Sequence, residues 1–298
     1  MIGRLLRAIG RIVGLVTGGY LAYVAVRGSR ILVRPDVRPF VPDTEGGPAT
    51  PADVGLEFEP VRFTTADGFT LSGWLIPAAR ETRTAVVVLH GFAGHRLPEL
   101  VTVVPWLAER HHVLQFDFRG HGESDPGAIT VGSHERRDVA AAVAFLELRG
   151  FGPMALFGIS MGAAIAILSA PELPVAAVIA DAAFAELRHP IASRLRGAGY
   201  PLPDLGSRAI VFGASVRTRS RSADPIRAVA RIAPRALLII APRDDEVISW
   251  RQSVRLFDAA GEPKELFVVT GAGHGQAYAA APEAYRSRVL DFLERHLG

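Results

Sequence analysis

Short apolar runs recur along most of this chain, and they constrain its fold more than any other feature. They lie at residues 85–90, 112–118, 154–159, 175–181, 236–241 and 266–270. Stretches with helical spacing of apolar residues, such as 133–150 and 282–298, lie between most of them. Strands that are apolar throughout are buried on both faces, so this alternation predicts an α/β fold with a mostly parallel central sheet and helices on both faces. In such sheets the chemistry gathers at the carboxyl ends of the strands.

A further pair of segments and the composition complete the outline of the globular part. Residues 61–65 and 70–76 flank the turn at 66–69 and alternate in polarity, which predicts a β-hairpin. With 298 residues, 49% of them hydrophobic, the chain is long enough to bury one large core. It contains no cysteine, which excludes disulfides and thiolate nucleophiles. The net charge of +3 is small and no basic stripe is interleaved with aromatic residues, so we expect no nucleic-acid partner.

The first 34 residues differ from the rest because they contain no acidic residue. Three arginines precede the uncharged stretch 12–26 and three follow it: Arg4, Arg7, Arg11, Arg27, Arg30 and Arg34. As a helix, this stretch spans about 22 Å, and arginines that reach outward at both ends can close the gap to a hydrocarbon core of about 30 Å. We therefore expect residues 1–34 to form a single membrane anchor or signal-anchor that contacts the membrane through residues 12–26.

Two alternatives to the anchor remain. A signal peptide fits the charged start and the apolar middle, but no cleavage site of the small-x-small type follows. A helix packed on the body of the protein is the other alternative. Arginines on both flanks leave the side of the membrane open.

The segment 35–60 carries six prolines and no helical periodicity. It therefore predicts a proline-rich linker between the anchor and a globular domain over residues 61–298. No residue that we expect to take part in catalysis precedes residue 55. Residues 1–34 are accordingly expected to be dispensable for activity.

The pentapeptide GISMG, residues 158–162, ends one apolar run and precedes a helix of small residues. Glycine is required on both sides of Ser160 if the strand passes through a tight turn into the helix, because side chains at Gly158 and Gly162 would collide there. Such a turn exposes the serine hydroxyl. The pattern predicts that Ser160 is a nucleophile, and the alternative is a serine in a tight turn without chemistry.

A serine nucleophile needs a base, and the base needs an acid that orients it. Of the nine histidines, His274 is the best candidate for the base, because it lies in a glycine-rich loop directly after the last strand. The loop after the preceding strand offers three carboxylates, those of Asp244, Asp245 and Glu246. Asp181, at the end of another strand, is a further candidate acid, although capping of the following helix is its simpler role.

Acyl transfer also requires amide donors for the charge that develops on the carbonyl oxygen. The amide of Met161, next to the predicted nucleophile, is one of them. We expect the second from the loop after the run at 85–90, where Gly91 permits a sharp turn and Phe92 is the predicted donor. His90 is expected to shape this loop rather than to act as the base.

Six motifs, taken in their order along the chain, resemble those of α/β-hydrolases: TTADGFTLSGWLIPA, VVVLHGFAGHR, FDFRGHGESD, LFGISMGAA, IAPRALLIIAPRDDEVIS and GAGHGQAY. They cover about residues 55–298, and the chain order of nucleophile, acid and histidine is that of this fold. The chain is similar to the branch that joins serine aminopeptidase-like, dienelactone hydrolase-like and prolyl oligopeptidase-like proteins. Relatives in this branch often carry an N-terminal anchor. The resemblance implies structural roles for Asp117, Arg119 and His121.

The resemblance also selects between the neighbouring acids. Aligned without gaps from IAPR onward, the family's acid falls on Asp245. Two departures are present: Ala241 and Pro242 stand where relatives usually carry histidine and glycine, and Ser249 stands where they carry proline. Counting from Ala241 as if it were the family's glycine would select Asp244 instead. The resemblance therefore gives Asp245 as the acid, with Asp244 as the alternative.

Between Asp181 and the IAPR motif, this family inserts cap elements, and the resemblance implies a small helical cap at about residues 183–230. Residues 183–222 contain seven arginines against two acids. A solvated basic cap explains this balance, and an acidic or membrane-surface substrate is the alternative.

Together these features predict a carboxylesterase-like serine hydrolase. Ser160, His274 and Asp245 would cleave an ester, or a thioester or amide, through an acyl-enzyme. Ester hydrolysis is favoured over peptide hydrolysis because the cap is small and no propeller domain is present. No metal or organic cofactor is implied, and the expected substrate is a small-molecule or lipid-like acyl compound. An acyltransferase and a catalytically inactive, membrane-associated binding protein are the alternatives, and the oligomeric state stays open.

Overall fold

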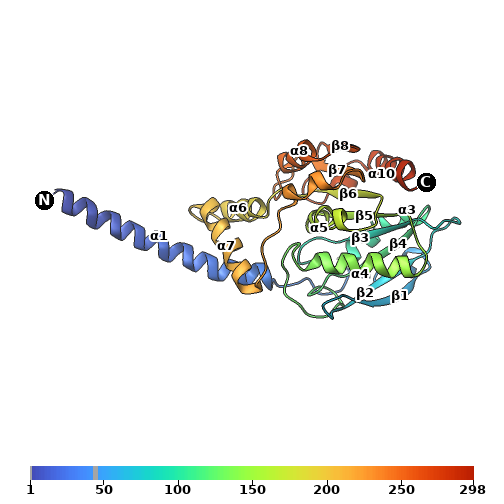
Figure 1. Ribbon diagram of the computed structural model, residues 1–298, viewed down its shortest axis with the longest axis horizontal. Helices are drawn as coiled ribbons and strands as arrows, with labels where there is room; N and C mark the ends of the chain where they lie inside the picture. Colours follow the sequence, from blue (N-terminus) through green and yellow to red (C-terminus); the bar gives the residue numbers. More distant parts are fainter. Residues whose placement is uncertain (1, 43–45) are drawn as a thin grey trace.

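The computed structural model describes residues 2–42 and 46–298, and an eight-stranded sheet lies at its centre (Figure 1). Its strands are β1 (Glu59–Thr64), β2 (Thr70–Ile76), β3 (Ala85–Leu89), β4 (His112–Phe116), β5 (Met154–Ile159), β6 (Ala177–Asp181), β7 (Ala236–Pro242) and β8 (Lys264–Val269). They lie side by side in the order β1-β2-β4-β3-β5-β6-β7-β8. The hairpin β1–β2 is antiparallel and β2 is antiparallel to β4, whereas all other neighbours are parallel. The predicted hairpin and the mostly parallel sheet are thus confirmed.

Each of the six apolar runs coincides with one strand from β3 to β8, with ends that differ by at most two residues. β3, β6 and β7 are buried at every position because they lie inside the sheet and both of their faces are covered. β8 forms one edge of the sheet, and most of its residues are half-buried. The apolar runs therefore mark the strands, and the degree of burial follows from the place of each strand in the sheet.

Helices cover both faces of the sheet, as predicted. Side chains of α4 (Glu135–Leu148), α5 (Met161–Ser169) and α8 (Trp250–Ala259) share one hydrophobic core. On the other face, α2 (Leu97–Leu100), α3 (Val104–Ala108), α9 (Ala277–Ala280) and α10 (Pro282–Leu297) share the second. The two cores separate because successive side chains of a strand point to opposite faces.

Two more helices, α6 (Arg188–Gly197) and α7 (Pro203–Thr218), lie outside these layers and within the segment 183–230. They follow β6 and pack on each other to form a small cap beside the sheet (Figure 1). The first helix of the chain, α1 (Ile2–Val33), crosses α7 with the C-terminal part of its length. Glycines permit this close crossing: a Cβ on Gly28 would lie 2.5 Å from the side chain of Ile210, and one on Gly213 would lie 2.9 Å from the carbonyl oxygen of Ala25.

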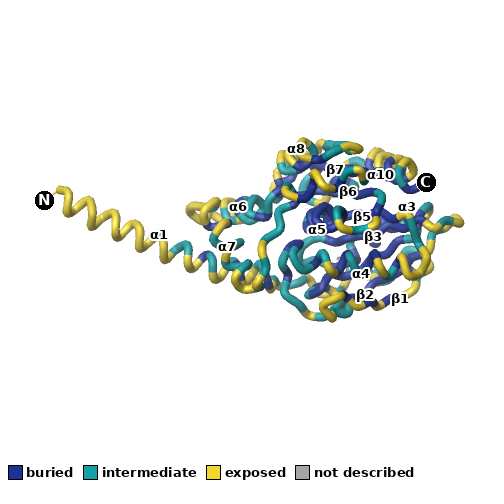
Figure 2. Tube along the Cα trace, viewed as in Figure 1, coloured by how far each residue is buried: buried dark blue, intermediate teal, exposed yellow. Residues whose placement is uncertain are grey.

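The N-terminal part of α1 projects away from the rest of the molecule and is exposed along its length (Figure 2). Among the described residues, α1 is the one helix that is long and apolar enough to cross a membrane. Its C-terminal part behaves differently, because Val24 and Val33 are buried against the protein. The N-terminal part is thus exposed and apolar, which fits both the predicted anchor and a signal peptide, whereas the C-terminal part packs on the body of the protein.

The segment 35–60 lies against the body in the part that the structure describes, and residues 43–45 of the predicted linker lie outside the described residues. The amide of Arg38 donates to the carbonyl oxygen of Ala93 at 3.0 Å. The guanidinium of Arg96 lies 4.3 Å from the centre of the Phe40 ring. Residues that follow α1 are thereby attached to the loop after β3.

Candidate active site

Ser160 stands between β5 and α5, at the carboxyl end of a central strand. Its backbone adopts φ +56°, a region that residues other than glycine rarely occupy, and this strained turn presents the side chain above the sheet. A Cβ on Gly158 would lie 2.3 Å from the carbonyl carbon of Gly162, and one on Gly162 would lie 2.1 Å from the carbonyl oxygen of Leu89. The two glycines are therefore required by close backbone contacts, as the sequence predicted.

His274 reaches Ser160 from the loop after β8. Its Nε2 lies 3.0 Å from Oγ of Ser160, and its Nδ1 lies 2.7 Å from Oδ2 of Asp245. The imidazole is 22% exposed, whereas the side chain of Asp245 is fully buried. The structure thus brings Ser160, His274 and Asp245 into one continuous chain of hydrogen bonds.

The neighbouring acids have other partners. Oδ1 of Asp245 accepts hydrogen bonds from the amides of Val247 and Ile248, at 2.8 and 2.7 Å, which fixes the carboxylate and leaves Oδ2 for His274. Asp244 is exposed, and its Oδ2 accepts a hydrogen bond of 2.8 Å from the amide of Gly271. The two adjacent side chains therefore point to different parts of the last loop.

Asp181 lies at the end of β6 and makes no contact with His274 within hydrogen-bond distance. The hydroxyl of Tyr285 donates to Oδ2 of Asp181 at 2.8 Å. Burial raises the pKa of this carboxyl to about 7, although the hydrogen bond from Tyr285 lowers it. Tyr285 belongs to α10, so Asp181 joins the sheet to the last helix instead of capping the segment that follows it.

Phe92 and Met161, the residues whose amides are the predicted donors, line the same small cavity as Ser160. Gly91 lies close enough that a Cβ there would be 3.8 Å from Cβ of Ser160. His90 is buried, its Nδ1 lies 2.8 Å from the carbonyl oxygen of Gly91, and its Nε2 accepts a hydrogen bond of 3.1 Å from the amide of Phe118. His90 therefore shapes the loop after β3, as expected.

The residues of the FDFRGHGESD motif form buried ion pairs beside the site. Asp117 pairs with Arg96, and Arg119 pairs with Asp138 at 2.6 Å. Nδ1 of His121 lies 3.0 Å from the carbonyl oxygen of Arg119. None of these groups contacts the Ser160–His274–Asp245 chain, and each has a structural partner.

Several residues that line the site were missed in the sequence. The cavity at Ser160 has a volume of about 60 Å³ and is mostly apolar. Leu32 comes from α1, and Ile191 and Arg194 come from α6. The expected cap indicated the region of α6, but no signal in the sequence indicated α1. Within residues 2–42 and 46–298, no group of three or more histidine or acidic side chains is placed to hold a metal ion.

Comparison with known proteins agrees with this architecture. A family model described as serine aminopeptidase, S33, matches residues 80–225, which include Phe92, Ser160 and Met161. YfhR, an uncharacterised protein of Escherichia coli O157:H7, is 30% identical over 247 residues, which cover 79% of this chain and 80% of YfhR.

Solved structures of enzymes resemble the whole fold. The esterase Pf2001 of Pyrococcus furiosus superposes with a TM-score of 0.74 at 27% identity, covering 88% of this chain and 98% of the esterase. The α/β-hydrolase GrgF of Penicillium, also named a polyketide transferase, superposes with a TM-score of 0.66 at 26% identity, covering 81% of this chain and 99% of GrgF. The family match, the relative and the sheet topology lead to one conclusion: this chain belongs to the serine aminopeptidase (S33)-like family of α/β-hydrolases.

Proposed function

We propose that the protein is a serine hydrolase that cleaves carboxylic esters through an acyl-enzyme on Ser160. The observation that supports this proposal most is the chain of two hydrogen bonds, 3.0 Å from Ser160 to His274 and 2.7 Å from His274 to Asp245. These are the distances at which a base can take a proton from a serine and an acid can orient that base. Pf2001, which superposes over most of its length, is named an esterase.

The proposed reaction follows from these positions. Nε2 of His274 takes the hydroxyl proton as Oγ of Ser160 attacks the ester carbonyl carbon. The amides of Phe92 and Met161, two residues of the same cavity, would stabilise the negative charge that develops on the carbonyl oxygen. The tetrahedral intermediate then expels the alcohol, which takes the proton from His274. A water molecule, activated by His274, hydrolyses the acyl-enzyme and restores Ser160.

Labelling with a fluorophosphonate tests the proposal, because only an activated serine reacts. We expect the full-length protein to label and to hydrolyse p-nitrophenyl butyrate, and we expect Ser160→Ala to do neither. The loss of turnover should be on the order of 10⁴-fold or more, because the nucleophile itself is removed. An unlabelled wild-type protein would point to the inactive binding protein, and unchanged turnover in Ser160→Ala would contradict the assignment of the nucleophile.

An acyltransferase would use the same acyl-enzyme, and the name of GrgF keeps this alternative open. The two functions differ in the acceptor of the acyl group. Water is the acceptor in our proposal, so added alcohols should shift only a small part of the product from acid to ester. An acyl-enzyme that persists in water and is released by an added alcohol would favour the acyltransferase.

We also propose that α1 anchors the protein to a membrane. The helix is 32 residues long, its N-terminal part is exposed, and apolar side chains such as Leu15 and Val16 are 76% and 66% exposed. Exposed apolar surface of this extent is unfavourable in water and favourable in a bilayer. After lysis of the cells that make it, the full-length protein should sediment with membranes and resist a carbonate wash. Recovery in the soluble fraction would contradict the anchor.

A further inference from the structure

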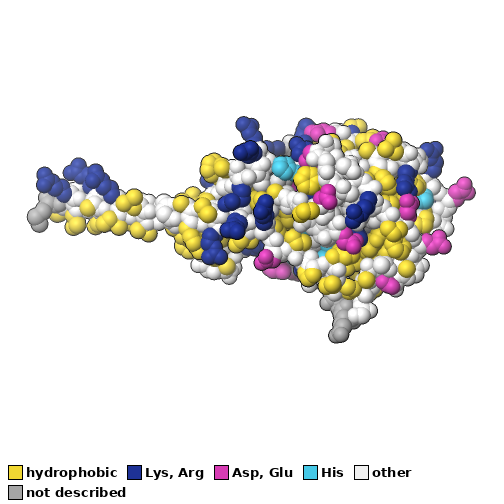
Figure 3. Space-filling view, turned by 90° about the horizontal axis from the view of Figure 1, so that it is seen from below, with side chains coloured by type: hydrophobic (Ala, Val, Ile, Leu, Met, Phe, Trp, Pro, Cys, Tyr) yellow, Lys and Arg dark blue, Asp and Glu magenta, His cyan; other side chains and the backbone are white. Residues whose placement is uncertain are grey.

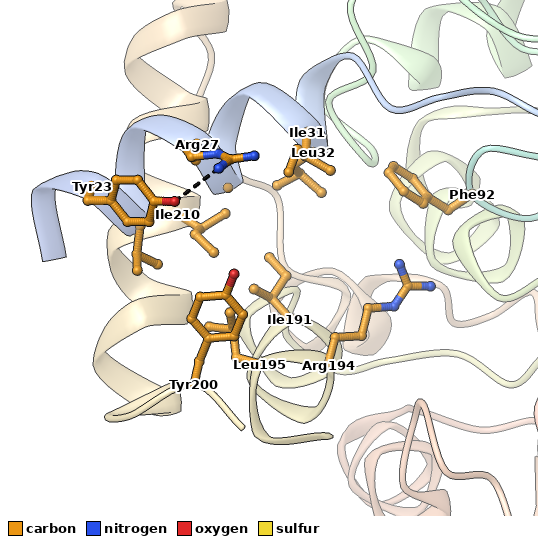
Figure 4. Close-up of a pocket in the computed structure, with 12 residues that line it drawn as sticks. Tyr23, Arg27, Ile31, Leu32, Phe92, Ile191, Arg194, Leu195, Tyr200 and Ile210 are labelled. Carbon is orange, nitrogen blue, oxygen red and sulfur yellow. Dashed lines mark hydrogen bonds between the residues drawn. The ribbon is translucent and has the colours of Figure 1, made fainter. Parts of the chain in front are cut away.

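A second cavity adjoins the one at Ser160. It has a volume of about 260 Å³ and lies between α1 on one side and α6 with α7 on the other (Figure 4). Its lining is mostly apolar and includes Val24, Ile31 and Leu32 of α1, Ile191 and Leu195 of α6, and Ile210 of α7. In Figure 4, Ile31 and Leu32 of α1 face Ile191 and Leu195 of α6 across this space.

The two cavities share four lining residues, namely Leu32, Phe92, Ile191 and Arg194. The cavity at Ser160, at about 60 Å³, is far below the roughly 300–1,000 Å³ of typical small-molecule sites. Together with the second cavity, the space reaches the lower end of that range. Because the two cavities share these walls, the second cavity offers the adjoining apolar space for an acyl chain on Ser160 that is longer than a few carbons.

The second cavity lies beside surfaces that suit a bilayer. On α7, Phe212 and Val216 are 70% and 63% exposed, and on α1, Val26 and Ile31 are also exposed. Basic side chains gather over the cap and at the N-terminal end of α1 (Figure 3), and a surface of this charge is attracted to anionic lipids. α1 continues from the wall of the cavity into its exposed N-terminal part, so the helix that we propose as the anchor leads directly to the cavity.

We propose that the physiological substrate is a long-chain lipid ester, whose acyl chain occupies the cavity between α1 and the cap while its carbonyl lies at Ser160. This inference rests on the proposed hydrolase function and adds the class of the substrate. It also gives α1 a second role, because the helix that anchors the protein forms one wall of the acyl site. The apolar lining supplies the affinity, because it removes the CH₂ groups of the acyl chain from water.

The test compares two chain lengths in the full-length protein in detergent micelles, with p-nitrophenyl laurate as the long ester and p-nitrophenyl butyrate as the short one. Leu195 lines only the second cavity, so Leu195→Trp fills it and leaves the walls at Ser160 unchanged. Ile31→Trp fills it from the side of α1. Leu205→Trp, on the exposed side of α7 and outside both cavities, is the matched control.

The wild-type protein should hydrolyse laurate with a higher kcat/KM than butyrate. Both filling variants should lose at least 10-fold in kcat/KM for laurate and less than about 3-fold for butyrate, because discrimination of a single methylene is worth roughly 10–200-fold. The control should retain both activities. Thermal unfolding reports whether each variant is folded, and a variant that is not folded is replaced by the one that fills the cavity from the opposite wall.

Three results would overturn the inference. A wild-type preference for butyrate, or laurate turnover that neither filling variant reduces, would leave the hydrolase intact and remove the acyl site. Equal losses of both esters in two folded variants would do the same. Failure of the proposed function looks different, because then neither ester is turned over in a Ser160-dependent manner and the serine does not label.

Discussion

Replacement of Asp245 by asparagine is the sharpest test of the proposed acid, because the structure fixes the orientation of the new side chain. Oδ1 of Asp245 accepts hydrogen bonds from two backbone amides, those of Val247 and Ile248. In Asp245→Asn, only the amide oxygen can accept these bonds, so the NH₂ group must take the position of Oδ2 and face His274. An NH₂ group there can only donate to Nδ1, which places the imidazole proton on Nε2.

This tautomer prevents catalysis because Nε2 must be free to accept the proton of Ser160. The substitution also removes the negative charge that stabilises the imidazolium. In the best-studied serine triad, the same replacement lowers kcat about 10⁴-fold, which corresponds to about 5.5 kcal/mol of transition-state stabilisation. We expect a loss of this size here, since the bond from Asp245 to His274 is short, at 2.7 Å, and fully buried on the side of the acid.

Asp244→Asn is the matched control, one residue away. The exposed carboxylate of Asp244 accepts a single bond from the amide of Gly271, and an asparagine oxygen can accept the same bond. Turnover of p-nitrophenyl butyrate in Asp244→Asn should therefore stay within about 3-fold of wild type, because replacement of an exposed side chain by a neutral one of the same shape has a small effect. Thermal unfolding of both variants checks that they are folded. The reverse pattern would place the acid at Asp244, and two mild effects would refute the orientation argument and return Asp181 as the candidate.

Three further predictions concern stability and the anchor. Asp181→Asn should retain butyrate turnover and remove a pH dependence of stability. The native carboxyl, with a pKa of about 7, binds more protons between about pH 4 and pH 7 than the unfolded one. Over this range, denaturant titrations of the wild type should therefore show a free energy of unfolding that falls by up to about 1.4 kcal/mol per pH unit. Gly162→Ala should lose more than about 3 kcal/mol of stability, because its Cβ would lie 2.1 Å from the carbonyl oxygen of Leu89. Gly197→Ala is the control: the space around its Cβ is open, so the free energy of unfolding in the same titration should change little. Deletion of residues 2–19 should move the protein to the soluble fraction with butyrate turnover retained. Loss of turnover in a folded product would contradict the division of α1 into an exposed N-terminal part and a C-terminal part that packs on the body.

The sequence predicted the sheet and the elbow well because both are encoded locally. An apolar run of five to seven residues has one stable environment in a chain of this kind, the interior of a covered sheet. Gly158 likewise reports a backbone contact within the same turn, with Gly162, whereas Gly162 reports the close approach of Leu89 at the end of β3. His274 could be placed from its loop alone, since the carboxyl ends of parallel strands meet at one edge whichever order the strands take.

The choice between Asp244 and Asp245 could not be made from local pattern. Both residues follow β7, and their directions depend on which backbone amides each carboxylate meets. Asp245 meets the start of the segment that leads into α8, and Asp244 meets the loop after β8. The ungapped alignment with the family predicted Asp245 in spite of the changes at Ala241, Pro242 and Ser249. The length of the loop, and not its flanking residues, determines where the carboxylate lies.

The packing of α1 beside the active site could not be predicted from the sequence. The uncharged stretch ends at Val26, so Gly28, Ile31 and Leu32 resembled the flank of a membrane span. In the fold, Val24, Gly28 and Leu32 recur every four residues, and this face of the helix lines the cavity beside the cap.

This arrangement changes what the anchor requires. Tyr20 is hydrogen-bonded to Pro201 of the cap, and residues from Val24 onward contact α7. The uncharged part of α1 left for the bilayer is therefore residues 12–19, about 12 Å of helix against a hydrocarbon core of about 30 Å. We therefore expect a protein anchored by α1, with the cap still attached, to place the exposed side chains of α7, such as Phe212 and Val216, against the membrane. The cavity beside Ser160 then opens at the lipid surface, which is the position that hydrolysis of a long-chain lipid ester requires.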